Sequence, residues 1–233
     1  MLNIARDFLR LKKLFIIAFT STLTCPVALS QKSHFSFTTD ASVLRSLNEN
    51  QKYWAIGQTL NFLFHFMPTD GAYAWFSYYS KGHINNVVNA NAKSSTTVPQ
   101  QVKFQNKSEL SFEHVSLGWR HYLKGRYDAE SKWNLYAYAG FGLMMGTVSN
   151  TQSTSIDTSL YHVPVLSGKG YFKRLTFDLG VGAEVPVGAD VFAYLEARTL
   201  IPTTDYPSPY LLVNDNAPFT LAVNIGVRIL FPD

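Results

Sequence analysis

The sequence predicts an all-β protein: an eight-stranded antiparallel transmembrane up-and-down β-barrel, preceded by a cleaved signal peptide. Three observations support this prediction. Apolar residues alternate with small or polar ones in eight segments, short and long connections alternate along the chain, and the N-terminus has the pattern of a secretory signal. We therefore divide the chain into a signal peptide, residues 1–30, and one outer-membrane β-barrel domain, residues 31–233.

The alternation is clearest in the last segment, Phe219–Phe231. Its odd positions are all apolar: Phe219, Leu221, Val223, Ile225, Val227, Ile229 and Phe231. Its even positions are mostly small or polar: Thr220, Ala222, Asn224, Gly226, Arg228 and Leu230. Successive side chains of a strand point to opposite faces, so this segment is a strand with one apolar face. It is long for an ordinary strand and suited to crossing a bilayer at a tilt.

The composition agrees with a membrane barrel. Charged residues make up 15% of the chain, compared with roughly 25% in a soluble domain. A helical membrane protein would need runs of about 20 apolar residues, and the sequence has none. The apolar residues occur in alternation instead, as in strands that face lipid on one side.

The N-terminus predicts export through the Sec pathway. Four basic residues come first: Arg6, Arg10, Lys12 and Lys13. The apolar stretch Leu14–Leu23 is too short to span a membrane, and Ala28-Leu29-Ser30 fits a cleavage site. A lipoprotein alternative would use Cys25, but Thr24 is unfavourable directly before a lipidated cysteine.

Removal of residues 1–30 takes away four basic residues and one acidic residue, so the formal net charge falls from +4 to +1. The basic character therefore belongs to the signal, and we expect no nucleic-acid partner. The single cysteine leaves with the peptide. The mature chain then has no disulfide, no zinc–cysteine site and no cysteine nucleophile.

Four strands are expected in the first half. The strand His34–Ser42 places on one face Phe35, Phe37 and Ala41. The strand Tyr53–Phe66 places on one face Trp54, Ile56, Leu60, Phe62, Phe64 and Phe66. The strand Ala72–Ser80 is aromatic on both faces, so its inward face is undecided. The strand Glu109–Leu123 places on one face Val115, Leu117, Trp119 and Leu123.

The second half supplies the other four strands. The strand Trp133–Val148 alternates Leu135, Ala137, Ala139, Phe141, Leu143 and Met145. The strand Lys173–Val185 alternates Leu175, Phe177, Leu179, Val181, Ala183 and Val185. The strand Val191–Ile201 carries on one face Val191, Ala193, Leu195 and Ala197. Phe219–Phe231 completes the set, and we expect the tryptophans at the membrane interfaces: Trp54, Trp75, Trp119 and Trp133.

The connections fall into two classes. Short turns are expected at 67–71, 124–131 and 186–190, and long polar loops at 83–107, 150–170 and 202–218. Outer-membrane barrels have short periplasmic turns and longer extracellular loops. We therefore expect three long extracellular loops and both termini in the periplasm.

The opposite parity of the strands must line the interior. It contains eight of the fourteen glycines: Gly57, Gly118, Gly140, Gly142, Gly146, Gly180, Gly182 and Gly226. An eight-stranded barrel is just wide enough to be filled by side chains, so large inward residues need small neighbours. The same parity contains six charged residues that we expect to form an ion-pair network: Arg120, Asp178, Glu184, Glu196, Arg198 and Arg228.

Within this network the sequence predicts two groups. A turn centred between Val187 and Ala189 would place Asp178 opposite Arg198, so we expect that ion pair. We expect a second cluster toward the periplasmic end, containing Glu184, Arg120 and Arg228. A filled interior favours a stabilising polar plug over a gate whose pairs exchange to admit ions.

With these features the sequence resembles the small eight-stranded outer-membrane barrels of Gram-negative bacteria: the OmpA membrane domain, OmpX and the opacity-type proteins. The resemblance covers Ser33–Phe231 as architecture and only loosely as sequence. The last strand is similar to the assembly signal of this family at Asn224, Gly226, Ile229 and Phe231, with Pro232-Asp233 added after the aromatic residue. The resemblance implies recognition by the barrel-assembly machinery and contact with outer-membrane lipids and lipopolysaccharide.

One short motif suggests chemistry. His114 and Ser116 share a strand face, and lipid A deacylase barrels use a His-x-Ser motif. Leu117-Gly118 stands where that family has Asn-Ala, and two polar residues in the lumen explain the pattern as well. We assign no catalytic residues and expect no enzyme activity, no cofactor and no metal site; the six histidines show no metal-ligand spacing.

The function expected from the sequence is a structural or surface-interaction role, through the long loops of a barrel with a filled polar interior. Three alternatives remain: a lipid A-modifying enzyme at His114 and Ser116, a narrow pore, and an accessory subunit of an envelope or secretion complex. An extracellular or envelope protein is a further expected partner.

Overall fold

The computed structural model describes residues 34–129, 132–188, 190–205, 207–215 and 218–231. Within these ranges the strands are β1 (His34–Ser46), β2 (Trp54–His65), β3 (Asp70–Ala92), β4 (Gln101–Lys124), β5 (Asn134–Gln152), β6 (Tyr161–His162), β7 (Gly168–Pro186), β8 (Val191–Pro202) and β9 (Thr220–Phe231). A single 3-10 turn, η1 (Glu49–Gln51), precedes β2. No helix among the described residues is long and apolar enough to cross a membrane. The expected signal peptide, residues 1–30, and the alternative lipidation site Cys25 lie outside the described residues.

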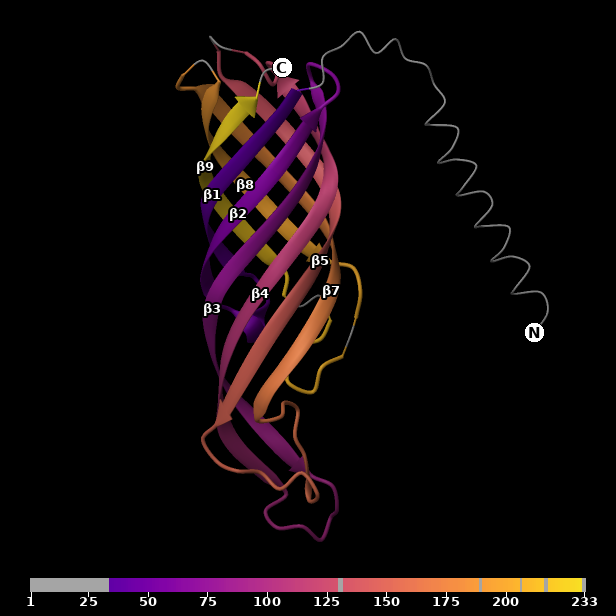
Figure 1. Ribbon diagram of the computed structural model, residues 1–233. Helices are drawn as coiled ribbons and strands as arrows, with labels where there is room; N and C mark the ends of the chain where they lie inside the picture. Colours follow the sequence, from indigo (N-terminus) through magenta and orange to yellow (C-terminus); the bar gives the residue numbers. More distant parts are fainter. Residues whose placement is uncertain (1–33, 130–131, 189, 206, 216–217, 232–233) are drawn as a thin grey trace, which may run out of the picture. The chain divides into compact units, whose positions relative to one another are not determined.

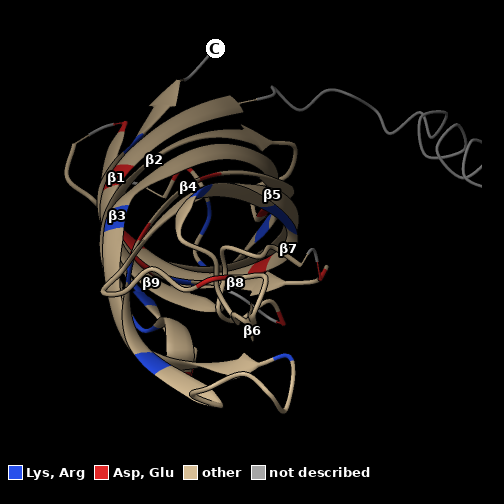
Figure 2. Ribbon diagram, turned by 90° about the horizontal axis from the view of Figure 1, so that it is seen from below, with Lys and Arg blue, Asp and Glu red and all other residues tan. Residues whose placement is uncertain are grey.

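Eight of the described strands close into a ring. All neighbouring pairs are antiparallel, in the order β2-β1-β9-β8-β7-β5-β4-β3, and a β2–β3 pairing completes the circle. The first and last strands, β1 and β9, pair with each other from Phe35 opposite Phe231 to Ser46 opposite Thr220. Figure 1 shows the strands winding obliquely around the barrel, and Figure 2 shows the ring end on. The predicted fold class is confirmed: an eight-stranded antiparallel barrel, to which β6 adds a two-residue pairing with β3.

The expected apolar face points outward on every strand where the sequence assigned one. On β9 the outward side chains from Leu221 to Phe231 are between 39% and 68% exposed, while Asn224 and Arg228 are fully buried inside. The same holds on β2, where Trp54, Ile56 and Phe62 are exposed and Leu63 is buried. All eight strands carry exposed apolar side chains, which together form the apolar belt that lipid-facing strands require.

The structure decides the parity of β3. Tyr73, Trp75 and Tyr79 point inward and are buried, while Phe76 and Tyr78 are exposed. The expected interfacial role of Trp75 is therefore wrong, because its ring stacks on Tyr73 inside the barrel, with a centroid distance of 4.5 Å. Aromatic residues on both faces gave the sequence no way to choose between them.

The inward glycines make room for inward aromatic rings. A Cβ atom on Gly180 would collide with the ring of Tyr138, and one on Gly182 would collide with Tyr136. Gly140 gives the same space to Tyr73. These rings are buried, so the interior is packed by large side chains set against bare backbone.

The expected loop 83–107 is wrong: most of it is strand. β3 continues to Ala92 and β4 begins at Gln101, and the two strands pair as far as Asn91 opposite Gln101. This hairpin extends past the other strands in Figure 1. A bulge between Tyr79 and Gly82 shifts the alternation by one residue, and polar side chains cover the exposed face, so the period-two pattern is broken.

The long connections lie at one end of the barrel. The two longest connections, 153–167 and 203–219, join strands at the same end as 47–53 and 93–100, whereas 66–69, 125–133 and 187–190 join them at the other. The second expected loop, 150–170, is shortened because β5 runs to Gln152 and β7 starts at Gly168. A small core organises this end, formed by Val88, Ala90, Phe104 and Tyr161.

Candidate functional site

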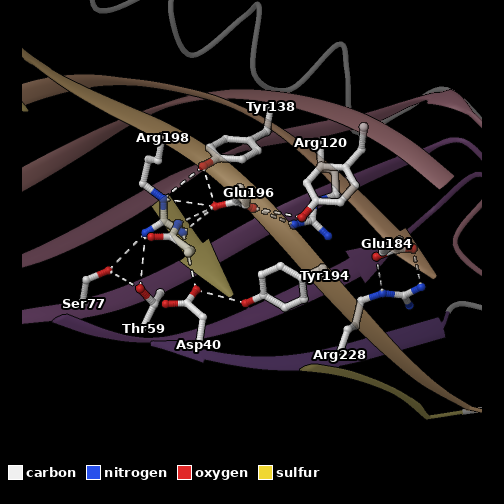
Figure 3. Close-up of polar contacts among 12 residues, drawn as sticks. Asp40, Thr59, Ser77, Arg120, Tyr138, Glu184, Tyr194, Glu196, Arg198 and Arg228 are labelled. Carbon is white, nitrogen blue, oxygen red and sulfur yellow. Dashed lines mark hydrogen bonds and ion pairs between the residues drawn. The ribbon is translucent and has the colours of Figure 1, made fainter. Parts of the chain in front are cut away.

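The interior of the barrel contains a network of buried charges centred on Glu196. Its Oε1 accepts hydrogen bonds from Arg198 Nη2 at 2.8 Å and from Tyr138 Oη at 2.7 Å. Its Oε2 accepts from Tyr136 Oη at 3.1 Å and from Arg120 Nη2 at 3.4 Å. Figure 3 shows this carboxylate between two arginines that arrive from different strands.

Arg198 joins this centre to the opposite wall. Its Nη1 donates to Thr59 Oγ1 at 3.3 Å and to Ser77 Oγ at 3.4 Å, and its Nη2 lies 3.8 Å from Asp40 Oδ2. The guanidinium also lies 4.0 Å from the ring centroid of Trp75. Glu196 and Arg198 are two residues apart on β8, so the strand period points both into the lumen.

A second pair lies toward the end that contains the short turns. Arg228 donates through Nε and Nη2 to the two oxygens of Glu184, at 3.0 and 2.7 Å. Its Nη1 donates to Ser36 Oγ at 3.0 Å, and its Nη2 also donates to the Tyr127 carbonyl at 2.7 Å. Both side chains are buried, and this bidentate geometry is the strong form of an arginine–carboxylate contact.

The second cluster expected from the sequence was Glu184, Arg120 and Arg228. Glu184 and Arg228 form a pair, whereas Arg120 makes its ion pair with Glu196 and stacks over Tyr136, with Cζ 3.8 Å from the ring centroid. Arg120 therefore belongs to the central network.

The expected ion pair between Asp178 and Arg198 does not form. Arg198 lies opposite Gly180, and Asp178 lies opposite Leu200. The turn between β7 and β8 is centred one residue later than the sequence analysis assumed, which moves every cross-strand partner by two positions. Asp178 instead lies with its Oδ2 3.4 Å from His114 Nε2.

His114 and Ser116 are not assembled as base and nucleophile. His114 Nδ1 accepts from Trp75 Nε1 at 3.1 Å, and Nε2 lies 2.8 Å from Thr176 Oγ1. Ser116 Oγ donates to the Phe141 carbonyl at 3.2 Å. Both side chains are buried inside the barrel, away from the exposed apolar face of β4.

The residues of the expected assembly signal lie on β9. Asn224 points inward and donates to Glu196 Oε1 at 3.0 Å, and Gly226 lies beneath Tyr194. Ile229 and Phe231 point outward and are 39% and 53% exposed. Recognition of these four residues by an assembly machinery stays a prediction.

Two inward charges were missed by the sequence analysis: Asp40 on β1, which lies beside Arg198, and Arg174. Arg174 lies on β7 with the parity of Asp178 and Glu184, and its side chain is fully buried at the end of the barrel that contains the long connections. Only Nη1 has a hydrogen-bond partner, the Lys173 carbonyl at 2.9 Å, and the guanidinium carbon lies 5.8 Å from the ring centroid of Phe172. Parity alone would have placed it inward, but the absence of an acid beside it follows from the folded structure. Among the described residues, no group of three or more potential ligand side chains could hold a metal ion.

Comparisons with known proteins identify the class of fold. No protein-family model matches the sequence, and no curated protein sequence matches it. Among solved structures, the chain is similar to Neisserial surface protein A, with a TM-score of 0.55 and 10% identity over 86% of this chain and 100% of that one. It also matches Ail of Yersinia pestis, with a TM-score of 0.48 and 11% identity over 86% of this chain and 100% of that one. The fold is thus that of the small outer-membrane β-barrels, as the resemblance predicted.

Proposed function

We propose that this chain is an integral protein of the outer membrane of a Gram-negative bacterium, with a structural and surface-interaction role. In this proposal the barrel anchors the long connections outside the cell and the termini lie in the periplasm. The observation that carries it is the closed ring with an apolar belt outside and paired charges inside. Only a lipid environment favours that arrangement over its reverse.

The interior supports a plug. Three arginines are neutralised by acids from other positions of the wall, and aromatic rings fill the space above bare glycine backbone. A pore would need water where these side chains lie. The pore alternative therefore requires the network around Glu196 to open, and discrete conductance steps in a planar bilayer would show that it does.

The β3–β4 hairpin supports an interaction role. It carries its own small apolar core and pairs with β6, so it presents an ordered surface. Apolar side chains nevertheless remain exposed on it: Val87 is 59% exposed, and Val98 on the connection is 87% exposed. An ordered projection offers a fixed surface to a protein partner, either extracellular or within an envelope complex.

A crosslinking pull-down from native envelopes tests this role. A variant that replaces residues 87–105 with a two-residue turn removes the outer part of the hairpin, including Val87 and Val98, and keeps the β4–β5 pairing that begins at Asn106. Heat-modifiable migration on a gel checks that the shortened barrel still folds. We expect the wild-type protein to capture a partner that the shortened variant does not. An identical set of captured proteins would remove the hairpin as the interaction surface.

Two further elements of the proposal concern assembly and chemistry. The last strand, with Phe231 exposed at its end, is proposed to be read by the barrel-assembly machinery, and the belt to contact phospholipid and lipopolysaccharide. We propose no enzyme activity. An unchanged lipid A mass spectrum after Ser116→Ala is the expected result, and an altered acyl pattern would reverse it.

A further inference from the structure

The β-sheet of the barrel wall is interrupted beside the start of β7. The β7–β8 pairing ends where Thr176 meets Pro202, so no described strand pairs with residues 168–175 on that edge. Residues 203–205 and 207–210 form the crossing segment beside it. It contacts the edge of β7 where Thr203 N donates to the Leu175 carbonyl at 2.8 Å.

Arg174 lies at this interruption, and two of its three guanidinium nitrogens make no hydrogen bond. Its side chain is fully buried, and Nε and Nη2 have no hydrogen-bond partner. No described acid lies within ion-pair distance; Asp205, an exposed residue, attracts it only from further away. Nε and Nη2 form the edge of a guanidinium that binds an oxyanion through two parallel hydrogen bonds.

The same edge is occupied in Arg228. There Nε and Nη2 donate to the two carboxylate oxygens of Glu184, both within 3.0 Å. A buried charge is costly unless it is paired, and every other fully inward arginine of the described wall has an acid. The Nε–Nη2 edge of Arg174 can therefore bind an anion that comes from outside the chain.

A pocket of about 610 Å³ opens beside Arg174. Ser208 and Tyr210 add polar groups from the crossing segment, and Lys173 lines the pocket from the outward face of β7, opposite the face that carries Arg174. The rest of the wall is apolar and includes Leu143 and Leu175, which belong to the outward, lipid-facing side of β5 and β7. The volume is in the usual range for small-molecule sites, about 300–1,000 Å³.

We propose that this pocket binds the phosphate-bearing headgroup of an amphiphile of the outer leaflet. Arg174 holds the phosphate through Nε and Nη2, and the apolar chain lies along Leu143 and Leu175. The two-nitrogen edge of a guanidinium matches the oxygens of a phosphate, which it binds through two parallel hydrogen bonds. The position at the outer rim of the belt rests on the proposed outer-membrane location.

Calorimetric titration of the full mature barrel in zwitterionic phosphatidylcholine nanodiscs tests the site. The probe is dodecyl phosphate, with dodecanoate, dodecanol and inorganic phosphate as comparison ligands. We expect dodecyl phosphate to bind, dodecanol not to bind, and Arg174→Gln to weaken binding by tenfold or more. The control Arg45→Gln removes an exposed arginine from β1 and should change affinity by less than twofold.

Arg174→Lys separates charge from geometry. It retains the cation and lacks the two-nitrogen edge, so binding should weaken severalfold and remain detectable. Equal affinity of Arg174→Gln and wild type would overturn the site. Equal binding of inorganic phosphate would reassign it to a free anion, and tighter binding of dodecanoate would overturn the phosphate assignment.

Assays of membrane insertion test the barrel and its location separately from ligand binding in the pocket. Heat-modifiable migration and recovery in the membrane fraction report on the barrel and its location, whatever the pocket binds. A barrel that inserts normally and ignores dodecyl phosphate would refute the site alone. A chain that stays soluble after signal removal would refute both.

Discussion

Arg228 and Arg174 are both fully buried arginines on the inner face of the same barrel, and they differ in what their guanidinium meets. Arg228 donates to both oxygens of Glu184, to a serine and to a backbone carbonyl. Arg174 donates once, to the carbonyl of the residue before it. The first lies at the end of the short turns and the second at the end of the long connections.

The two arginines differ in what they can do: Arg228 stabilises the fold, and Arg174 has the capacity to bind an anion. A buried ion pair completed within the chain holds strands together and leaves nothing for a ligand to do. A buried cation with an empty edge destabilises the fold unless something else supplies the anion. Arg228 therefore stabilises the end with the short turns, and Arg174 is the residue proposed to bind a ligand at the other end.

The largest expected effect comes from breaking the complete pair. Glu184→Ala leaves Arg228 buried without its acid, and we expect the free energy of unfolding to fall by about 3–5 kcal/mol. Urea titration of the refolded barrel in phosphatidylcholine vesicles, followed by tryptophan fluorescence, measures this. Glu109→Ala breaks an exposed pair with Lys81, 2.6 Å apart, and should leave stability unchanged. A stable Glu184→Ala protein would show that the pair contributes little.

The next effect tests the inward and outward faces on which the comparison depends. Val223→Arg places a charge on the lipid-facing side of β9, at a cost of about 2–4 kcal/mol near the bilayer midplane. Membrane fractionation should show impaired insertion. Val98→Arg makes the same substitution on an outer connection, where the side chain is 87% exposed, and should insert normally. Normal assembly of Val223→Arg would reverse the assignment of faces.

Those faces could be predicted because lipid on one side and packed side chains on the other force a strict period of two. The pattern failed where this contrast ends. Beyond Tyr78 the β3–β4 hairpin leaves the apolar belt, and the bulge between Tyr79 and Gly82 shifts the parity. A strand that meets water outside and a small core inside has no long apolar alternation, so it was interpreted as a loop.

The interior residues were predicted better than their partners. Parity placed Glu196, Arg198 and Arg228 inward, because parity is a local property of a strand. Partners depend on register, and a one-residue error in the centre of a turn gave Arg198 the wrong acid. Arg174 could not be recognised at all, because an empty hydrogen-bonding edge is visible only when every neighbour is placed.

The third effect has the opposite sign to the first. Arg174→Leu removes a buried cation that lacks an acid, so we expect the unliganded barrel to gain up to about 1–3 kcal/mol of stability. The urea midpoint in phosphatidylcholine vesicles measures it, beside Glu184→Ala under the same conditions. Addition of dodecyl phosphate should stabilise wild type and leave the variant unchanged. A large loss of stability in Arg174→Leu would mean that Arg174 has a structural role after all.

The smallest expected effect comes from placing an acid beside Arg174, so that it has a buried carboxylate partner as Arg228 does. Met144 is buried on β5 directly opposite Arg174, within reach of its side chain. Met144→Glu supplies the acid that Arg174 lacks, whereas Met144→Gln has the same size without the charge. We expect the glutamate variant to be more stable than the glutamine variant by about 1 kcal/mol. We also expect it to lose dodecyl phosphate binding that the glutamine variant retains, since a carboxylate then fills the Nε–Nη2 edge. If both variants bind equally, the anion does not contact Arg174, and the contrast between the two arginines has no functional meaning.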